Sequence, residues 1–228
     1  MSTLEDYLAF AKAHSTLFAN PPEGGITILL NEDEIREAEA TVARRLEAQG
    51  LPAEWARVGI TFRDQYVFLL RDAVRFPGDF LGTYSRLISE EDDPRGVIIL
   101  PVYQQQVLLI RHFRHATRTW HLEIPRGFGT KGLTSEENAR RELEEEIGAT
   151  ISRLFSLGQT YPNTGMTSEC DELFFAEVES YGDVEIQEAI TELLPTTVSE
   201  FERMIRDNEI TDGFTLAAYA RAKLKGLL

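Results

Sequence analysis

The chain has 228 residues, of which 43% are hydrophobic and 27% charged, which is the composition of an ordinary globular protein. This length suits one compact domain with an extension, or two small domains. The formal net charge of −15 argues against a surface that binds DNA or RNA. Cys170 is the single cysteine, which excludes an internal disulfide framework and a metal site built on thiolates.

The sequence predicts neither a secretory leader nor a membrane span. Residues 1–6 contain no basic start and no apolar run. The longest apolar stretches, 97–102 and 107–110, are far too short to cross a bilayer. We therefore expect a cytoplasmic protein with no nucleic-acid partner and no membrane partner.

The first part of the chain is predicted to be helical and then β-rich. Residues 4–18 alternate apolar and polar positions at helical spacing, and the Pro- and Gly-rich run 20–25 stops them. A second helix should follow Asn31, a natural N-cap, and end near Gly50. Residues 1–55 are thus predicted to form a helical N-terminal extension. Short β-rich runs at 60–62, 66–70 and 84–88 predict a small β-layer within residues 56–94.

Residues 95–228 alternate strands and helices. The continuous apolar runs 97–102 and 107–110 are typical of central strands that are covered on both faces of a sheet. A helix is predicted at 135–147, strands at 155–160 and 173–178, and helices at 198–208 and 211–224. This order favours an α/β sandwich.

The predicted helix 135–147 carries the most informative side chains. Thr134 and Glu137 form a capping box at its start, and Gly148 is placed to end it. The positions 139, 143 and 147 make an apolar stripe for the core. Glu142, Glu145 and Glu146 share a different face, where their charges repel unless a hard divalent cation such as Mg²⁺ binds between them.

The spacing of this segment resembles the Nudix box. The matching residues are Gly127, Arg141, Glu142, Leu143, Glu145, Glu146 and Gly148. Two positions depart from the pattern: Leu133 stands where the family has a loop-anchoring glutamate, and Ala149 is a small residue at the final apolar place. The resemblance implies a Nudix-type α/β/α sandwich with a mixed β-sheet.

The flanking residues are similar to the ADP-ribose pyrophosphatase branch of that family. The run 110–127 resembles its Arg-rich strand end and the turn before the box, although Arg126 replaces a small residue. The resemblance implies that the Arg126 carbonyl joins Glu142, Glu145 and Glu146 as a metal ligand. The catalytic residues it implies are Glu142, Glu146 and, from an acidic loop, Glu188, with Glu185 and Glu169 as alternatives to Glu188. The substrate-binding candidates are Arg111, Arg114 and Gly127.

The expected function is Mg²⁺-dependent hydrolysis of the diphosphate linkage in a nucleoside diphosphate derivative, with Mn²⁺ as an alternative cation. ADP-ribose, cleaved to AMP and ribose 5-phosphate, is the substrate that the resemblance favours. Two alternatives stay open: hydrolysis of a nucleotide sugar such as GDP-mannose, and a non-catalytic module that binds an ADP-ribose-like ligand. Leu133 is the feature that keeps the second alternative open. A homodimer formed through residues 56–94 is also expected from the resemblance.

Overall fold

The computed structural model describes residues 2–64, 67–88, 94–184, 186 and 189–228. The chain divides into two compact units. The first consists of residues 1–92 with 163–168, and the second of residues 93–162 with 169–228. Among the described residues, no helix is both long enough and apolar enough to cross a membrane.

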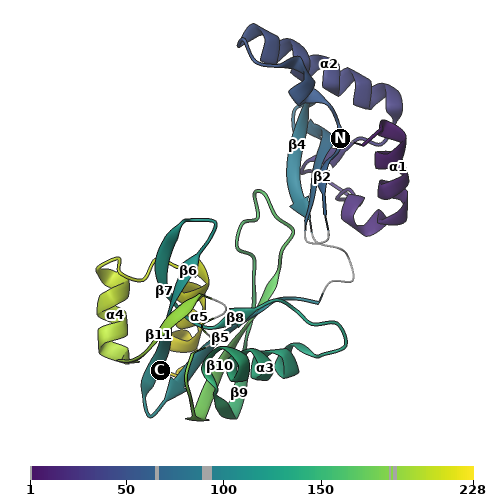
Figure 1. Cartoon of the computed structure of the whole chain (residues 1–228). Coiled ribbons are helices and arrows are strands. Elements are labelled where there is room, and N and C mark those ends of the chain that lie inside the picture. The colour runs from purple at the N-terminus through teal and green to yellow at the C-terminus, as the bar shows by residue number, and fades with distance from the viewer. Residues whose placement is uncertain (1, 65–66, 89–93, 185, 187–188) are drawn as a thin grey trace. The chain divides into compact units, whose positions relative to one another are not determined.

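The first unit combines helices with a small antiparallel sheet (Figure 1). Its elements are α1 (Leu4–Ala13), η1 (Ser15–Phe18), β1 (Thr27–Ile28), α2 (Glu32–Ala48), η2 (Ala53–Ala56), β2 (Gly59–Arg63), β3 (Phe68–Phe76) and β4 (Phe80–Ile88). Strand β3 lies at the centre and pairs with the other three strands. The predicted helix 4–18 therefore stops at residue 13 and continues as a short 3₁₀ turn.

A single hydrophobic core holds the first unit together. Asn31 begins α2 as predicted, because its side chain accepts hydrogen bonds from the backbone N–H groups of Asp33 and Glu34. Tyr7 of α1, Ile35 of α2 and Leu70 of β3 are all fully buried in one cluster. Residues from both predicted segments, 1–55 and 56–94, thus contribute to the same core.

The second unit is a three-layer sandwich around a mixed sheet. Its elements are β5 (Val97–Tyr103), β6 (Gln106–Arg114), β7 (Thr119–Glu123), β8 (Arg126–Gly127), α3 (Ser135–Ile147), β9 (Thr150–Thr160), β10 (Asp171–Ser180), β11 (Ile190–Thr197), α4 (Val198–Arg206) and α5 (Gly213–Leu224). Within the described residues, seven strands pair in one sheet, with the main order β11-β6-β5-β10-β9. Strands β5 and β10 are parallel, and the other pairs are antiparallel.

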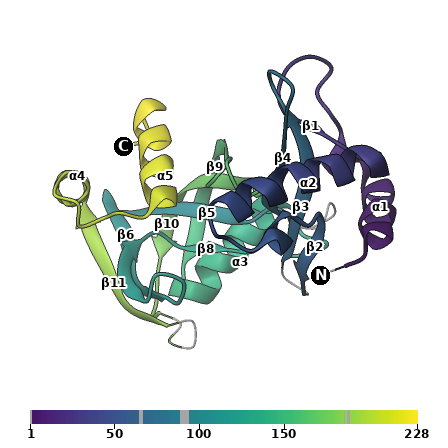
Figure 2. The ribbon, with the colours of Figure 1, turned by 90° about the horizontal axis from the view of Figure 1, so that it is seen from above.

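Helices cover both faces of this sheet, as the continuous apolar runs predict (Figures 1 and 2). The stripe of α3 packs with Val97 on one face, in a cluster that also holds Leu143. On the other face, Ala218 of α5 packs with Ile98 and Leu173. Neighbouring residues of β5 therefore point to opposite helices. The predicted α/β/α sandwich with a mixed sheet is confirmed.

The sequence reading did not predict strands β7, β8 and β11. Strand β8 has only two residues, which is too short for any periodicity. Strand β11 contains Pro195, a residue that removes a ladder hydrogen bond and counts against a strand. Because β11 is the last strand in the sheet order and pairs only with β6 there, the missing N–H can face away from the ladder.

Candidate active site

Helix α3 presents two buried carboxylates, and that of Glu142 lies against Gly127 of β8. It begins with the predicted capping box, in which Thr134 Oγ1 accepts from Glu137 N–H at 3.2 Å and the Glu137 carboxylate accepts from Thr134 N–H at 2.8 Å. Gly148 ends the helix in the left-handed conformation, with φ of 59°. Only 7% of Glu142 and 1% of Glu146 is exposed, although both are charged residues.

Gly127 is required by the position of Glu142. A Cβ atom built on Gly127 would lie 2.0 Å from the carboxyl group of Glu142, far inside any allowed contact. A side chain at position 127 would therefore displace the carboxylate from its place. Gly127 of β8 and Glu142 of α3 therefore form a sterically matched pair.

Arg141 ties the loop before α3 to the helix. Its Nη1 donates to Glu145 at 2.8 Å, and its Nη2 donates to Glu142 and, at 2.8 Å, to Thr130 Oγ1. Nη2 also lies 3.0 Å from Asn138 Oδ1, while Asn138 Nδ2 donates to the Phe128 carbonyl at 2.9 Å. The loop is thus held at several points without a carboxylate at position 133.

These groups form the wall of a cleft of about 650 Å³. The cleft brings together most of the residues that the sequence singled out, namely Arg114, Arg126, Gly127, Glu142, Glu145, Glu146 and Glu169. Glu185 and Glu188 lie outside the described residues. The cleft lining thus combines carboxylates with arginines.

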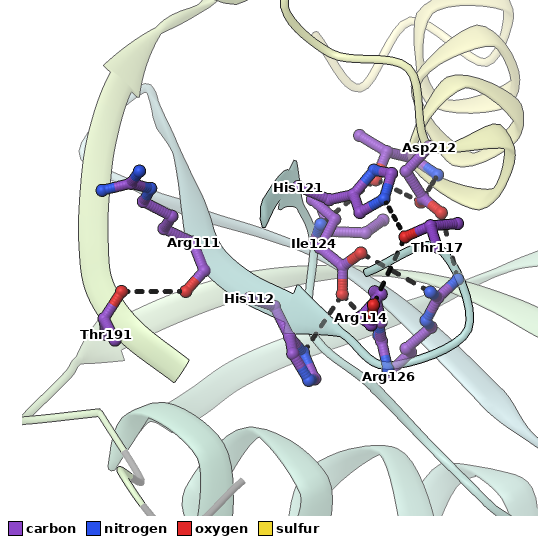
Figure 3. Close-up of polar contacts among 11 residues, drawn as sticks. Arg111, His112, Arg114, Thr117, His121, Ile124, Arg126, Thr191 and Asp212 are labelled. Carbon is purple, nitrogen blue, oxygen red and sulfur yellow. Dashed lines mark hydrogen bonds and ion pairs between the residues drawn. The ribbon is translucent and has the colours of Figure 1, made fainter. Parts of the chain in front are cut away.

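Arg111 is not among the residues that line the cleft. Its side chain is exposed, and its guanidinium lies over the Trp120 ring, 5.2 Å from the ring centroid. Strand alternation explains the difference, since His112 and Arg114 share one face of β6 and Arg111 has the other. Figure 3 shows Arg111 pointing away from the group that His112, Arg114 and Arg126 form.

A buried glutamate, Glu123, holds the side chains of Arg114 and Arg126 in the cleft. Glu123 is fully buried, and its carboxylate accepts a hydrogen bond from Arg114 Nη2 and lies 3.2 Å from His112 Nδ1. Burial by itself would raise the pKa of Glu123, but the interactions with His112, Arg114 and Arg126 outweigh it and hold the pKa below its ordinary value. Glu123 is therefore a fixed negative charge that orients Arg114 toward the cleft.

Arg126 is fixed from three sides. Its Nη1 donates to Asp212 at 3.1 Å (Figure 3), its Nη2 lies 3.5 Å from Glu123, and its guanidinium lies over the Phe214 ring at 4.8 Å. Asp212 also caps α5, because its carboxylate accepts from Thr215 N–H at 2.8 Å. Asp212 thereby links the start of α5 to Arg126, which lines the cleft.

Comparison with known proteins agrees with this geometry. The NUDIX domain family matches residues 92–210, which is more than half of the chain. The chain belongs to the Nudix family. It is 29% identical over 140 residues to the ADP-ribose pyrophosphatase of Bacillus subtilis (strain 168), a match that covers 59% of this chain and 75% of the relative. A solved structure described as an ADP compounds hydrolase shares the fold, with a TM-score of 0.66 and 19% identity over 75% of this chain and 93% of that one.

The protein is thus a Nudix pyrophosphohydrolase, and its cleft has the chemistry of an open site for a hard divalent cation. Within the described part of the chain, no group of three or more His, Cys, Asp or Glu side chains is placed to hold a metal ion. Magnesium does not need one, because it keeps several waters and takes substrate oxygens as ligands. The cradle that Gly127 makes for the carboxylate of Glu142, beside the buried Glu146, fits such a cation.

Several residues in or around this Nudix cleft were not predicted to have a role in it. They are His112, Glu123, Asp212 and Phe214, although strand alternation from Arg114 points to His112. Asp171 was also missed. Burial and the nearby Glu169 charge raise its pKa to about 6, and nothing in the sequence signals that it is buried.

Proposed function

We propose that this Nudix hydrolase cleaves the diphosphate linkage of ADP-ribose in a Mg²⁺-dependent reaction and releases AMP and ribose 5-phosphate. The observation that carries the proposal is the cleft itself, whose lining combines the buried Glu142 and Glu146 of α3 with arginines that are fixed by ion pairs. A diphosphate can interact with both kinds of residue, through metal ligation and through arginine contacts. The named activity of the Bacillus subtilis relative supports ADP-ribose as the substrate.

Glu142, Glu145, Glu146 and the carbonyl of Arg126 would hold Mg²⁺, with Mn²⁺ as an alternative. When bound, the cation would supply charge neutralisation on the phosphates and acidify a water for attack. Glu142 and Glu146 keep their position through the helix, and Gly127 leaves the space in which the carboxylate of Glu142 lies. Arg141 holds this acidic wall against the loop.

Arg114 and Arg126 would hold the phosphates and orient them for attack. Arg114 gives one side of its guanidinium to Glu123, and its Nε is buried without a hydrogen-bond partner among the described residues. A phosphate oxygen is an acceptor that would satisfy such a donor. Because both arginines are fixed by buried carboxylates, little side-chain freedom would be lost when substrate binds.

A carboxylate has to take the proton from the attacking water. Glu188 stays our first choice for this general base, because the acidic loop of this branch carries the catalytic glutamate. Glu169 is the alternative that lines the cleft, and Glu185 is the third. The proposed homodimer through residues 56–94 stays a prediction beside these assignments.

The decisive experiment is a Mg²⁺-supplemented substrate panel with wild-type protein and the variant Glu146→Gln. The panel contains ADP-ribose, nucleotide sugars, dinucleoside polyphosphates and nucleoside triphosphates. We expect AMP and ribose 5-phosphate from ADP-ribose, and a loss of kcat of about 1000-fold in Glu146→Gln, equivalent to several kcal/mol of transition-state stabilisation. The matched control is Glu144→Gln, which removes an exposed carboxylate from the same helix.

Three other outcomes would contradict the proposal in different ways. Near-normal turnover by Glu146→Gln, with Glu144→Gln also normal, would remove the metal assignment. Faster cleavage of GDP-mannose than of ADP-ribose would replace the substrate but keep the chemistry. Tight binding of ADP-ribose without turnover would make the protein a ligand-binding module.

A further inference from the structure

Asp171 is a buried carboxylate in the cleft that no metal, base or phosphate role above uses. It is the first residue of β10 and only 4% of it is exposed. Its Oδ2 atom is buried and has no hydrogen-bond partner among the described residues. A buried acceptor without a donor is unfavourable, so its presence in a cleft points to a partner that arrives with the ligand.

The chain makes room for this carboxylate. A Cβ atom on Gly96 would lie 2.5 Å from Asp171 Oδ1 and 3.2 Å from the carbonyl oxygen of Gly127. Any other residue at position 96 would push against Asp171. Gly96 thus leaves space for the carboxylate of Asp171, as Gly127 leaves space for that of Glu142.

Asp171 faces away from the carboxylates of α3. Asp171 and Leu173 share one face of β10 because side chains alternate along a strand, and Leu173 belongs to the core cluster under α5. The register pairs Arg126 with Ile98, another residue of that cluster, so Arg126 lies on the same face. Gly127 pairs with Val97 on the α3 face, which is where Glu142 meets it.

The neighbours of Asp171 define the chemistry of a ligand group at this place. The negative charge of Glu169 and, less strongly, the positive charge of Arg126 act on Asp171, and the Phe214 ring lies under the Arg126 guanidinium. At Asp171 itself, a phosphate would be repelled by the two carboxylates, and Arg126 opposes a cation. A neutral group that both donates and accepts hydrogen bonds suits the pair, and sugar hydroxyls are such groups.

We propose that Asp171, beside Arg126 and Phe214, forms a subsite that accepts hydrogen bonds from the hydroxyl groups of a ribose in the substrate. The proposal rests on the proposed function, since it names the part of the nucleoside diphosphate derivative that this wall of the cleft recognises. Either ribose of ADP-ribose supplies the required diol. The experiment separates the two sources.

The test measures binding by calorimetry with a non-hydrolysable α,β-methylene analogue of ADP-ribose. Two further ligands lack the 2- and 3-hydroxyls, one in the adenosine ribose and one in the terminal ribose. Wild-type protein is compared with Asp171→Asn, which keeps the shape and removes the charge. Glu179→Gln, an exposed change on the same strand, is the control. Catalysis is not needed for this readout.

We expect Asp171→Asn to bind the full analogue about 10- to 100-fold more weakly, as for the loss of a hydrogen bond to a charged group. For one deoxygenated ligand the substitution should change the affinity less than about 2-fold, and that ligand identifies the ribose that Asp171 contacts. Glu179→Gln should match wild type with all three ligands.

An equal loss for all three ligands, or no loss for any, would overturn the subsite and leave the proposed hydrolysis standing. Selective loss in a protein that binds the analogue but does not cleave ADP-ribose would keep the subsite and remove the proposed function. A wild-type protein that binds none of the three ligands would remove both.

Discussion

Each unit of the chain buries an aspartate, and the two aspartates differ in their hydrogen-bond partners. In the first unit, Asp72 accepts a hydrogen bond from the Tyr7 hydroxyl at 2.6 Å and pairs with Arg86 Nε at 2.6 Å. In the second unit, Asp171 Oδ2 has no such partner among the described residues. Both residues are at most 4% exposed.

The difference separates a structural charge from a binding charge. Arg86 is itself held by the Leu17 carbonyl at 2.6 Å, so the network of Tyr7, Asp72 and Arg86 joins elements of the first unit. Burial and the Asp72 charge raise the pKa of Tyr7 well above its ordinary value, which keeps the hydroxyl a donor. Such a network stabilises a fold. A buried carboxylate in a cleft that has no hydrogen-bond donor lowers the stability of the free protein and can gain that donor from a bound ligand.

Replacing either aspartate by asparagine should therefore change the free energy of unfolding, but in opposite directions. The larger change is expected for Asp72→Asn. This change leaves Arg86 without its charged partner inside the first unit. We expect the free energy of unfolding to fall by about 3 kcal/mol, as when a buried ion pair is broken from one side. Urea unfolding followed by Trp55, in a background with Trp120→Phe, reports on this unit. An unchanged urea midpoint for Asp72→Asn would show that the ion pair with Arg86 does not stabilise the first unit.

Asp171→Asn should raise stability by a smaller amount, and only near neutral pH. The pKa in the folded state is about 6, above the ordinary value of 3.8, so the native state binds the proton more tightly than the unfolded chain. Stability is then lost as pH rises from about 4 to about 6. Two pKa units correspond to about 3 kcal/mol. Because water reaches the cleft, we expect a gain of about 1 kcal/mol at pH 7.5.

The pH dependence is the check on that gain. At pH 4 most Asp171 is already neutral in the folded protein, so Asp171→Asn should unfold at the wild-type urea concentration. Unfolding followed by Trp120 in a Trp55→Phe background isolates the second unit. A stabilisation of equal size at both pH values would show that charge is not its cause.

The fold and the acidic wall of the cleft were predictable because their signals are local. A 3.6-residue period and a capping box define α3, and the family spacing selects Glu142, Glu145 and Glu146. Arg114 and Arg126 were predicted as site residues, but the buried carboxylates that fix them were not. The contacts of Arg126 with Asp212 and of Tyr7 with Asp72 join residues 86 and 65 positions apart, and one sequence carries no record of such pairing.

Asp171 shows the same limit from another direction. An aspartate at the start of a strand is ordinarily a turn residue, and the room for this carboxylate comes from Gly96, 75 positions earlier and directly before the neighbouring strand β5. Leu133 shows the reverse case, in which a departure from a motif suggested a defect. The structure shows a loop that is anchored to Arg141 by another residue, Thr130.

Thr130→Val tests that replacement and should have a small effect. It keeps the side-chain shape and removes the 2.8 Å hydrogen bond from Arg141 to the loop that precedes α3. Losing about 1 kcal/mol of this anchoring should lower kcat/KM about 5-fold. The Mg²⁺ concentration for half-maximal rate should rise as well, because the carboxylates beside Arg141 lose part of their support.

The chain offers its own rescue for this variant. Adding Leu133→Glu supplies a carboxylate where the family pattern has one, at a position whose side chain is already exposed. The double variant should recover most of the lost kcat/KM and the original Mg²⁺ dependence, while Leu133→Glu alone should change little. If Thr130→Val is as active as wild type, or if Leu133→Glu fails to restore it, Thr130 is not the residue that replaces the missing glutamate.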